Sequence, residues 1–343
     1  MRIAIDAMGA DNSPFPEVGG ACASLASDGF DIILVGDEEK IRPMLAKRGN
    51  PPRISVVHAS EIIGMDEQPV VAVRKKKDAS MLVAMRLVKT GQADAMVSAG
   101  NTGAVMVAAR NILRPIEGVS RSAICQQLPT MKGRSLVLDL GANVDCTARH
   151  LCDFAEMGVA YVRQILGIEE PRVGLLNIGE EQAKGNELAK TVHKVLSAAP
   201  HLNFVGNIEP KAFYQGATDV LVCDGFAGNL LLKTSEGAGH LIRTLLTREI
   251  MANPLSMLGG LLSRGAFKRL RRTVDPNEYT GAELLGVNGV VIILHGSCTA
   301  KGVANGIKGA RLALTKEVNK YILLGIRELR KAEDQIAQKE SNP

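Results

Sequence analysis

The sequence predicts an α/β fold with a mainly parallel sheet that helices cover on both faces. Short apolar, β-branched runs alternate along the chain with longer amphipathic runs, which is the order of strands and helices in a parallel sheet. The short runs are almost continuously apolar, as strands buried on both faces are. No Pro- or Ser-rich linker and no repeat of fixed period interrupts the pattern. We therefore expect one continuous α/β domain over 1–333, with two lobes as an alternative arrangement, and a polar tail over 334–343 that frays.

Ten apolar runs have the length and the β-branched content of strands. In chain order they are 2–7, 31–36, 53–59, 93–98, 122–128, 135–140, 172–178, 203–208, 219–223 and 289–295. Helices are expected between most of them, where apolar residues recur at helical spacing. These cover 16–27, 79–89, 102–113, 153–166, 186–198, 228–251 and 303–332.

Composition excludes several classes of protein. The chain has 343 residues, of which 46% are hydrophobic and 22% charged, and a chain of this length can bury a large core without disulfides or metals. It contains no Trp, four Tyr and seven Phe, so we expect no surface that stacks bases and no nucleic-acid partner. Its six cysteines show no CxxC and no Cys/His ligand spacing, which predicts reduced core cysteines and no metal site.

Charge and hydropathy predict a cytoplasmic protein. The net charge is +5, and most of the excess lies in residues 264–275, so the patch is local. Asp6 stands where a signal peptide needs apolar residues. No apolar run approaches the ~20 residues of a transmembrane helix.

Six predicted strands end in glycine beside a polar residue. These ends cover 6–11, 98–103, 139–143, 177–181, 224–229 and 295–298. Because ligands of open α/β sheets bind beyond the carboxyl ends of the strands, we expect the six ends to line one polar cleft. Backbone amides and helix N-termini in such a cleft favour an anion such as phosphate. Taken singly, each cluster is more typical of a turn or a helix cap than of a ligand site.

Several familiar motifs are absent. The chain has no GxxxxGK[ST], no GxGxxG after its first strand, no GxSxG and no HExxH. These absences argue against an ATPase, a serine hydrolase and a zinc enzyme.

Few cations stand near the predicted cleft. Lys184 lies between a strand end and the helix expected from Asn186. Lys233 follows Asn229 by four residues, so both can lie on one helix face. His295 ends the last strand, where a core histidine is the alternative to a functional one.

The strand-end motifs together resemble those of a known family. They read DAMGAD at 6–11, SAGNTGA at 98–104, LDLGAN at 138–143, LNIGEE at 176–181 followed by KGN at 184–186, DGFAGN at 224–229, and LLGVNG and HGSC towards the end. This set, in this order, resembles the bacterial phosphate acyltransferase family of phospholipid synthesis. The family usually has HGSS where this chain has Cys298 in the last position, so either a hydroxyl is dispensable there or Cys takes its place.

The resemblance implies a three-layer α/β/α fold like that of isocitrate and isopropylmalate dehydrogenases and phosphotransacetylase. It implies a homodimer that transfers a fatty acyl group from acyl-acyl-carrier protein to inorganic phosphate, giving acyl phosphate, with no metal and no other cofactor. Acyl carrier protein and inorganic phosphate are then partners, and the membrane glycerol-3-phosphate acyltransferase is a further expected one.

Phosphate is the nucleophile of such a reaction, so the protein supplies positioning and oxyanion donors. The catalytic candidates are Lys184, Asn229, Lys233 and His295. We expect Lys184 and backbone amides near 101–103 to hold phosphate, and the other three to polarise the carbonyl or to donate to the leaving sulfur. The candidates for substrate and phosphate binding are Asp6, Gly100, Asn101, Thr102, Gly103, Asn143, Asn177, Glu180, Asn186, Asp224, Gly225 and Ser297.

Two alternatives remain open at this point. One is a short-chain acyl-coenzyme A phosphotransferase, since the strand-end residues do not separate coenzyme A from carrier protein. The other is a non-catalytic scaffold that binds a phosphorylated metabolite and a membrane. The apolar and basic segment after Met251 favours the lipid pathway.

Residues 253–275 predict a projecting amphipathic segment. Pro254 suits a helix start, and Gly259–Gly260 is expected to break or kink the helix. Its apolar tip contains Leu255, Leu258, Leu261 and Leu262, and its basic part contains Lys268, Arg269, Arg271 and Arg272. This order predicts peripheral contact with an anionic membrane and docking of the acidic carrier protein. The alternative is a buried helix of the dimer interface.

Overall fold

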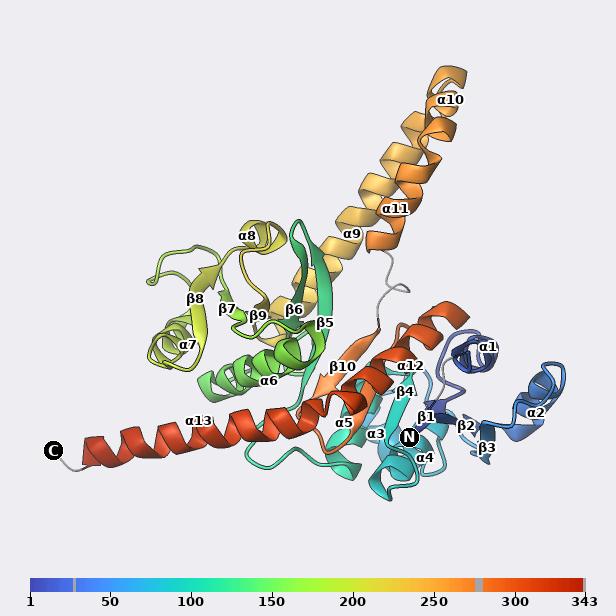
Figure 1. Cartoon of the computed structure of the whole chain (residues 1–343), viewed down its shortest axis with the longest axis horizontal. Helices are drawn as coiled ribbons and strands as arrows, with labels where there is room; N and C mark the ends of the chain where they lie inside the picture. The colour runs from blue at the N-terminus through green and yellow to red at the C-terminus, as the bar shows by residue number, and fades with distance from the viewer. Residues whose placement is uncertain (27–28, 275–279, 342–343) are drawn as a thin grey trace.

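A computed structural model describes residues 1–26, 29–274 and 280–341; of 271, 272, 274 and 332–341 it describes the backbone alone. Within these residues one eleven-stranded sheet runs through the molecule in the order β3-β2-β1-β4-β11-β10-β5-β6-β9-β7-β8 (Figure 1). The strands are β1 Arg2–Asp6, β2 Asp31–Gly36, β3 Ile54–His58, β4 Ala95–Ser98, β5 Ala123–Thr130, β6 Gly133–Leu138, β7 Arg172–Leu176, β8 Asn203–Ile208, β9 Val220–Val222, β10 Ala282–Leu285 and β11 Val290–Ile293.

The sheet reverses direction in its middle. β3, β2, β1, β4 and β11 are mutually parallel, and so are β6, β9, β7 and β8. Between them β10 and β5 pair antiparallel with each other and with their outer neighbours. The two parallel halves therefore run in opposite directions, and their strands end at opposite edges of the sheet.

Helices cover both faces of the sheet. They are α1 Phe15–Ser24, α2 Glu38–Ala46, α3 Pro69–Lys75, α4 Ser80–Lys89, α5 Thr102–Ile112, α6 Ala148–Leu166, α7 Glu187–Ser197, α8 Pro210–Tyr214, α9 Gly225–Ile250, α10 Pro254–Leu262, α11 Arg264–Val274, α12 Ala300–Thr315 and α13 Val318–Ser341. Buried side chains of α1, α2, α6, α7, α12 and α13 form a core with one face. Those of α3, α4, α5 and α8, joined by the start of α9, form a core with the other. The predicted three-layer α/β/α fold with a mainly parallel sheet is confirmed.

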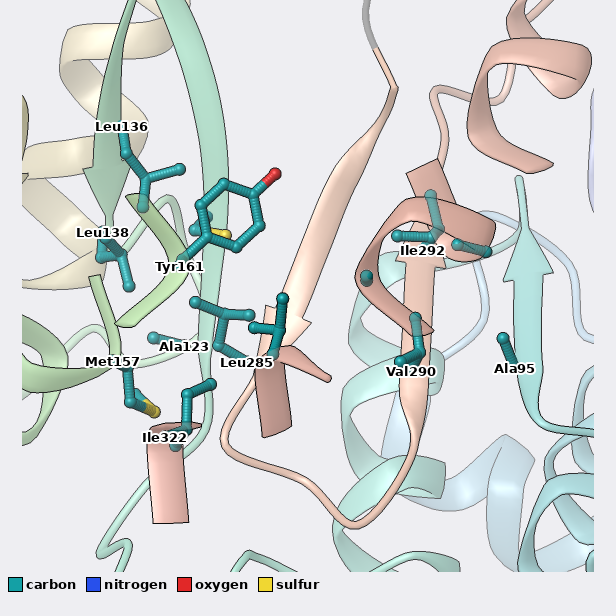
Figure 2. Packing of buried hydrophobic residues seen from close by; sticks show 14 of the residues in the cluster. Ala95, Ala123, Leu136, Leu138, Met157, Tyr161, Leu285, Val290, Ile292 and Ile322 are labelled. Atoms are coloured by element: carbon teal, nitrogen blue, oxygen red, sulfur yellow. The ribbon is translucent and has the colours of Figure 1, made fainter. Parts of the chain in front are cut away.

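One hydrophobic cluster continues through the middle of the molecule. Figure 2 shows members of it from β4, β11, β10, β5, β6, α6 and α13. Leu138, Met157, Leu285, Ile292 and Ile322 are all almost inaccessible to solvent. Strand β11 pairs with β4, so the last strand of the chain completes the half that the first strands began. This return of the chain joins the two parallel halves of the sheet through a shared core.

The ten predicted strands are confirmed to within two residues at each end, but β10 was not predicted. Its second residue, Glu283, interrupts the apolar run, yet its side chain is buried. Burial raises the pKa of the Glu283 carboxyl to about 8, so this side chain enters the core as a neutral acid at pH 7.

The helix predicted over 303–332 is two helices. α12 ends at Thr315 and α13 begins at Val318, with Glu317 in the left-handed region at φ 51°. The Asn319 amide donates to the carbonyls of Val287 and Gly289, at 3.0 Å each. Anchoring to the turn between β10 and β11 therefore sets where α13 starts. Its backbone is helical to Ser341, through most of the segment expected to fray, because Ala, Glu, Gln and Lys predominate there.

A helical arm projects from the body (Figure 1). α9 leaves the sheet, α10 lies at the tip and α11 returns along α9. Pro254 begins α10 as predicted, and Asn253 caps it by accepting a hydrogen bond from the Ser256 N–H at 2.9 Å. Of the break or kink predicted at Gly259–Gly260, the break is wrong, since the helix continues to Leu262. None of the described helices is both long enough and apolar enough to cross a membrane.

Gly260 has a packing role that its neighbour lacks. A Cβ on Gly260 would lie 2.6 Å from Cγ2 of Ile250, whereas one on Gly259 would meet nothing within 4 Å. Both Gly→Ala changes should gain roughly 0.5–1 kcal/mol of helix propensity. We expect Gly260→Ala to push α10 away from α9 and to speed amide hydrogen exchange in α10, while Gly259→Ala slows it. Equal protection in the two variants would contradict this account of the arm.

Candidate functional site

The six glycine-rich strand ends do not share one edge of the sheet, so the predicted single row of strand ends is wrong. The ends of β1, β4 and β11 lie at one edge, whereas those of β6, β9 and β7 lie at the other. The physical reason is the reversal at β10 and β5, which periodicity along the chain does not reveal. The predicted site residues consequently fall into separate groups.

The buried carboxylate of Asp6 organises the first group. It accepts hydrogen bonds from the hydroxyls of Ser80 at 2.6 Å and Ser98 at 2.7 Å. The Ser98 hydroxyl in turn accepts from the Gly100 N–H at 3.1 Å. Burial raises the pKa of Asp6, against the opposing effect of these hydroxyls. Asp6 and Gly100 are thus brought together, and Asp6 holds the loop rather than facing solvent.

Asn101 caps α5 and fixes the neighbouring loop. Its side-chain oxygen accepts from the Ala104 N–H at 3.0 Å. Its amide nitrogen donates to the carbonyls of Gly64, Met65 and Glu67 at 3.1–3.2 Å. Thr102 is exposed at the first position of α5, and Gly103 follows it. First-turn N–H groups have no intrahelical acceptor, so the amides of these two residues suit an anion.

His295 and Ser297 complete the first group. Nδ1 of His295 accepts from the Ser297 N–H at 3.2 Å and lies 2.8 Å from the Ser297 hydroxyl. Because Nδ1 is used as an acceptor, Nε2 carries the proton in the neutral ring. The Gly296 carbonyl accepts from the Asp11 N–H at 2.8 Å, which ties this loop to the one after β1. His295 is exposed, so the core-histidine alternative is wrong.

The second group is built on Asp139, which the sequence analysis did not single out. This fully buried carboxylate accepts from the N–H groups of Ile124 at 2.9 Å and Ala142 at 3.0 Å. It also accepts from the backbone and side-chain nitrogens of Asn143 at 2.7 and 2.9 Å. The Asn143 carbonyl accepts from the Gly225 N–H at 2.7 Å. Asn143 and Gly225 are therefore in contact, and Asn143 is spent largely on holding the loop.

The start of α9 carries three further candidates. The Asp224 carboxylate caps the helix by accepting from the Ala227 N–H at 2.7 Å. Asn229 is exposed next to Gly141, where an added Cβ would lie 3.6 Å from the Asn229 side chain. Lys233 pairs with Glu236 at 2.8 Å on the surface. Of the three, Asn229 is the side chain that stands free over the loop after β6.

The third group lies after β7, beside the end of β9. Asn177 is buried, and its amide donates to the Lys184 carbonyl at 3.1 Å. Asn186 caps α7 by accepting from the Ala189 N–H at 2.9 Å. Lys184 and Glu180 are exposed. Asn177 and Asn186 thus shape the loop that presents the Lys184 ammonium.

A small cavity beside Asn143 was also missed. It measures about 120 Å³. Its lining comprises Met106, Val107 and Arg110 of α5, Pro115, residues 120–122, Ala142 and Asn143. Pattern reasoning passed over Arg110 and Arg121 because neither stands at a glycine-rich strand end. A basic residue inside a helix carries no sequence signal of its own.

The thiols of Cys298 and Cys146 are not poised for nucleophilic chemistry, and the described residues form no metal centre. Burial raises the pKa of Cys298 to about 12 and that of Cys146 to about 12, so neither is a thiolate at neutral pH. Among the described residues, no three His, Cys, Asp or Glu side chains converge to hold a metal ion.

Glu17 predicts a pH dependence of stability. Burial raises its pKa from 4.5 to about 7, and its Oε2 has no hydrogen-bond partner among the described residues. Between these two pH values the folded state binds more protons than the unfolded state, so stability falls as pH rises. We expect the wild type to lose on the order of 3 kcal/mol from this group between pH 4.5 and 7. Thermal unfolding at pH 5 and 8 should show that the Glu17→Gln variant loses less stability between these pH values than the wild type does.

The control is Glu39→Gln, since Glu39 is exposed on α2. It should differ from the wild type equally at both pH values. If Glu17→Gln behaves in the same way, the buried carboxyl is not the source of the dependence.

Sequence comparison relates nearly the whole chain to one family. Residues 1–321 match the family model described as "Fatty acid synthesis protein". The chain is 48% identical over 323 residues to a phosphate acyltransferase of Trichlorobacter lovleyi, covering 94% of this chain and 93% of that one. It is 46% identical over 323 residues to the enzyme of that name from Geobacter sulfurreducens, with coverage of 94% and 93%.

Solved structures agree on the fold. A phosphotransacetylase from Streptococcus pyogenes aligns with a TM-score of 0.61 at 19% identity, covering 96% of this chain and 94% of that one. A branched-chain phosphotransacylase from Enterococcus faecalis aligns with a TM-score of 0.57 at 16% identity, covering 91% and 98%. At this identity they support the fold alone. The family match and the sequence relatives establish that the chain belongs to the phosphate acyltransferase family, and it is an acyltransferase.

Proposed function

We propose that this protein transfers a fatty acyl group from acyl-acyl-carrier protein to inorganic phosphate, giving acyl phosphate for phospholipid synthesis. The observation that carries the proposal is family membership over nearly the whole chain, glycine-rich strand ends included. The short-chain coenzyme A alternative has only fold-level support. The scaffold alternative has no support of its own.

The reaction does not require the protein to form a covalent bond with its substrates. A phosphate oxygen attacks the thioester carbonyl, the new C–O bond forms, and the C–S bond breaks to release the carrier thiolate, which takes up a proton. The protein must orient the two substrates and stabilise the oxyanion. The high thiol pKa of Cys298 is consistent with this direct attack, since no enzyme thiolate is required.

The exposed candidates are the ones we assign to substrate. We propose that phosphate groups bind at two places, at Lys184 at one edge of the sheet and at the amides of Thr102 and Gly103 at the other. Asn229 at the first edge and His295 at the second are proposed to donate to the carbonyl or to the leaving sulfur. Lys233 shares a helix face with Asn229 and can join it if its surface pair with Glu236 opens. Surface pairs are worth ~1 kcal/mol or less, so that opening costs little.

The remaining candidates are proposed to shape the site. Their side chains form hydrogen bonds within loops and helix caps, or they are glycines at which two backbone segments come close together. They are Asp6, Gly100, Asn101, Asn143, Asn177, Asn186, Asp224 and Gly225. Glu180 and Ser297 are exposed and remain proposed substrate contacts.

The arm suits a membrane surface. Leu255 and Leu262 are 80% exposed, and Leu258 and Leu261 are more than half exposed. Leu258 and Leu261 also line an apolar hollow of about 560 Å³ beside the end of α9. Exposed apolar side chains followed by the exposed cations Lys268 and Arg269 favour shallow insertion at anionic headgroups. The same cations can attract an acidic carrier protein. The side chains of Arg271 and Arg272 lie outside the described residues, so their role stays a prediction.

A second copy of the chain is the proposed partner of α9. Its exposed apolar side chains recur at helical spacing, at Leu230, Leu241, Ile242, Leu245 and Leu246. Such a stripe on a soluble protein favours an interface, which supports the proposed homodimer. The membrane glycerol-3-phosphate acyltransferase remains the proposed consumer of the product.

The first test is acyl phosphate formation from palmitoyl-acyl-carrier protein and phosphate. We expect the wild type to be active and Lys184→Ala to lose roughly 10- to 100-fold at limiting phosphate, because a charge-assisted contact contributes ~1.5–3 kcal/mol. Lys190→Ala is the control, since Lys190 lies on α7 in a surface pair with Glu187. A wild type that acts only on acetyl-coenzyme A would overturn the proposed function. Full activity of Lys184→Ala would remove Lys184 from the phosphate site.

The second test addresses the arm. Leu258→Glu should release the protein from anionic liposomes in a flotation assay while leaving a soluble, active dimer, because a carboxylate cannot enter the bilayer surface cheaply. Val195→Glu places the same change on exposed α7 and should leave flotation unaltered. A Leu258→Glu protein that dissociates or precipitates would instead support the dimer-interface alternative.

A further inference from the structure

The cavity beside Asn143 is small, and its mostly apolar lining includes two cations. Arg110 of α5 and Arg121 of the loop before β5 both line it. Within the described residues, neither guanidinium has a carboxylate within salt-bridge distance. Like charges that share one cavity repel each other, and a bound anion removes that cost.

Hydrogen bonds to α6 and α13 hold the loop that carries Arg121 in place. Asp153 of α6 is fully buried and accepts from the Ser120 N–H at 2.9 Å and from the Ser120 hydroxyl. Arg330 of α13 pairs with the same carboxylate and donates to the Gly118 carbonyl at 3.0 Å. Asp153 is thereby spent on the loop and is not available to Arg121.

The opposite wall is fixed as well. The Asn143 amide donates to the Ser122 carbonyl at 2.8 Å and to Asp139 at 2.9 Å. Asp139 also accepts from the Ile124 N–H, where β5 begins. Two buried carboxylates, one on each side, thus hold the loop so that Arg121 remains at the cavity without a described acidic partner. Rigid support of this kind is typical of a binding site.

We propose that Arg110 and Arg121 form a subsite for a phosphate group. A cavity of about 120 Å³ is far smaller than the ~300–1,000 Å³ that drug-sized ligands occupy, so it suits one small anionic group and excludes an acyl chain. Guanidinium groups bind phosphate through paired N–H donors. Asn143, between this cavity and the start of α9, links the subsite to Asn229 through the loop after β6.

The bound phosphate group can belong to either of two substrates. This choice of substrates rests on the proposed function. One is inorganic phosphate, the acyl acceptor. The other is the phosphodiester that joins the acyl-bearing arm to its carrier protein. The two are separated by calorimetric titration with inorganic phosphate, and with carrier protein in its holo form and in its apo form, which lacks the phosphodiester.

The test compares Arg110→Gln and Arg121→Gln with Arg114→Gln, an exposed arginine just beyond α5 that does not line the cavity. Both lining variants should weaken one anion about tenfold or more, with unaltered thermal unfolding, while Arg114→Gln binds as the wild type does. If the lining variants lose affinity for inorganic phosphate alone, the subsite binds the acyl acceptor. If the lining variants bind holo and apo carrier protein equally well, the subsite binds the phosphodiester. Because binding is measured without turnover, an inactive wild type would overturn the proposed function and leave this test standing. Unchanged binding of both probes would overturn the subsite.

Discussion

The antiparallel pairing of β10 and β5 is the constraint on which the arrangement of the molecule depends. These two strands reverse the direction of the sheet between β11 and β6. They also join two parallel halves that would otherwise present separate edges to solvent. Because β11 returns to pair with β4, the two halves share one continuous core. The loops at the two edges are thereby held in a fixed relation without a linker.

Buried carboxylates organise the loops on that frame. Asp6, Asp139 and Asp153 each accept several hydrogen bonds from backbone or hydroxyl donors. Buried charges are stable only when they are hydrogen-bonded or paired, so each acid fixes the groups around it. The exposed side chains of Lys184 and Asn229 take no part in these three networks. This division suits a reaction in which phosphate itself is the nucleophile, because the protein then has to orient substrates more than to react with them.

The arm extends the same chain to another environment. α9 begins inside the second group of site residues, capped by Asp224, and ends at the apolar tip beside α10. One helix therefore connects the loop after β6 to the surface proposed to meet a membrane. A fatty acyl product is poorly soluble in water. The proposed acyl transfer and the proposed membrane contact are therefore physically compatible, because the product would form close to the bilayer.

Sequence alone determined the fold class, ten strands and the candidates at their ends, because apolar periodicity and glycine-rich ends are local properties. It placed Pro254 correctly, but it missed β10, since Glu283 reads as a surface residue and only burial makes it a neutral acid. It predicted a break or kink at Gly259–Gly260, but the helix is unbroken there and Gly260 instead allows the close approach of Ile250. Tertiary structure alone decided which strand ends share an edge, because strand direction follows from long-range pairing. It alone also brought Arg110 and Arg121, from different elements, to one cavity beside Asn143.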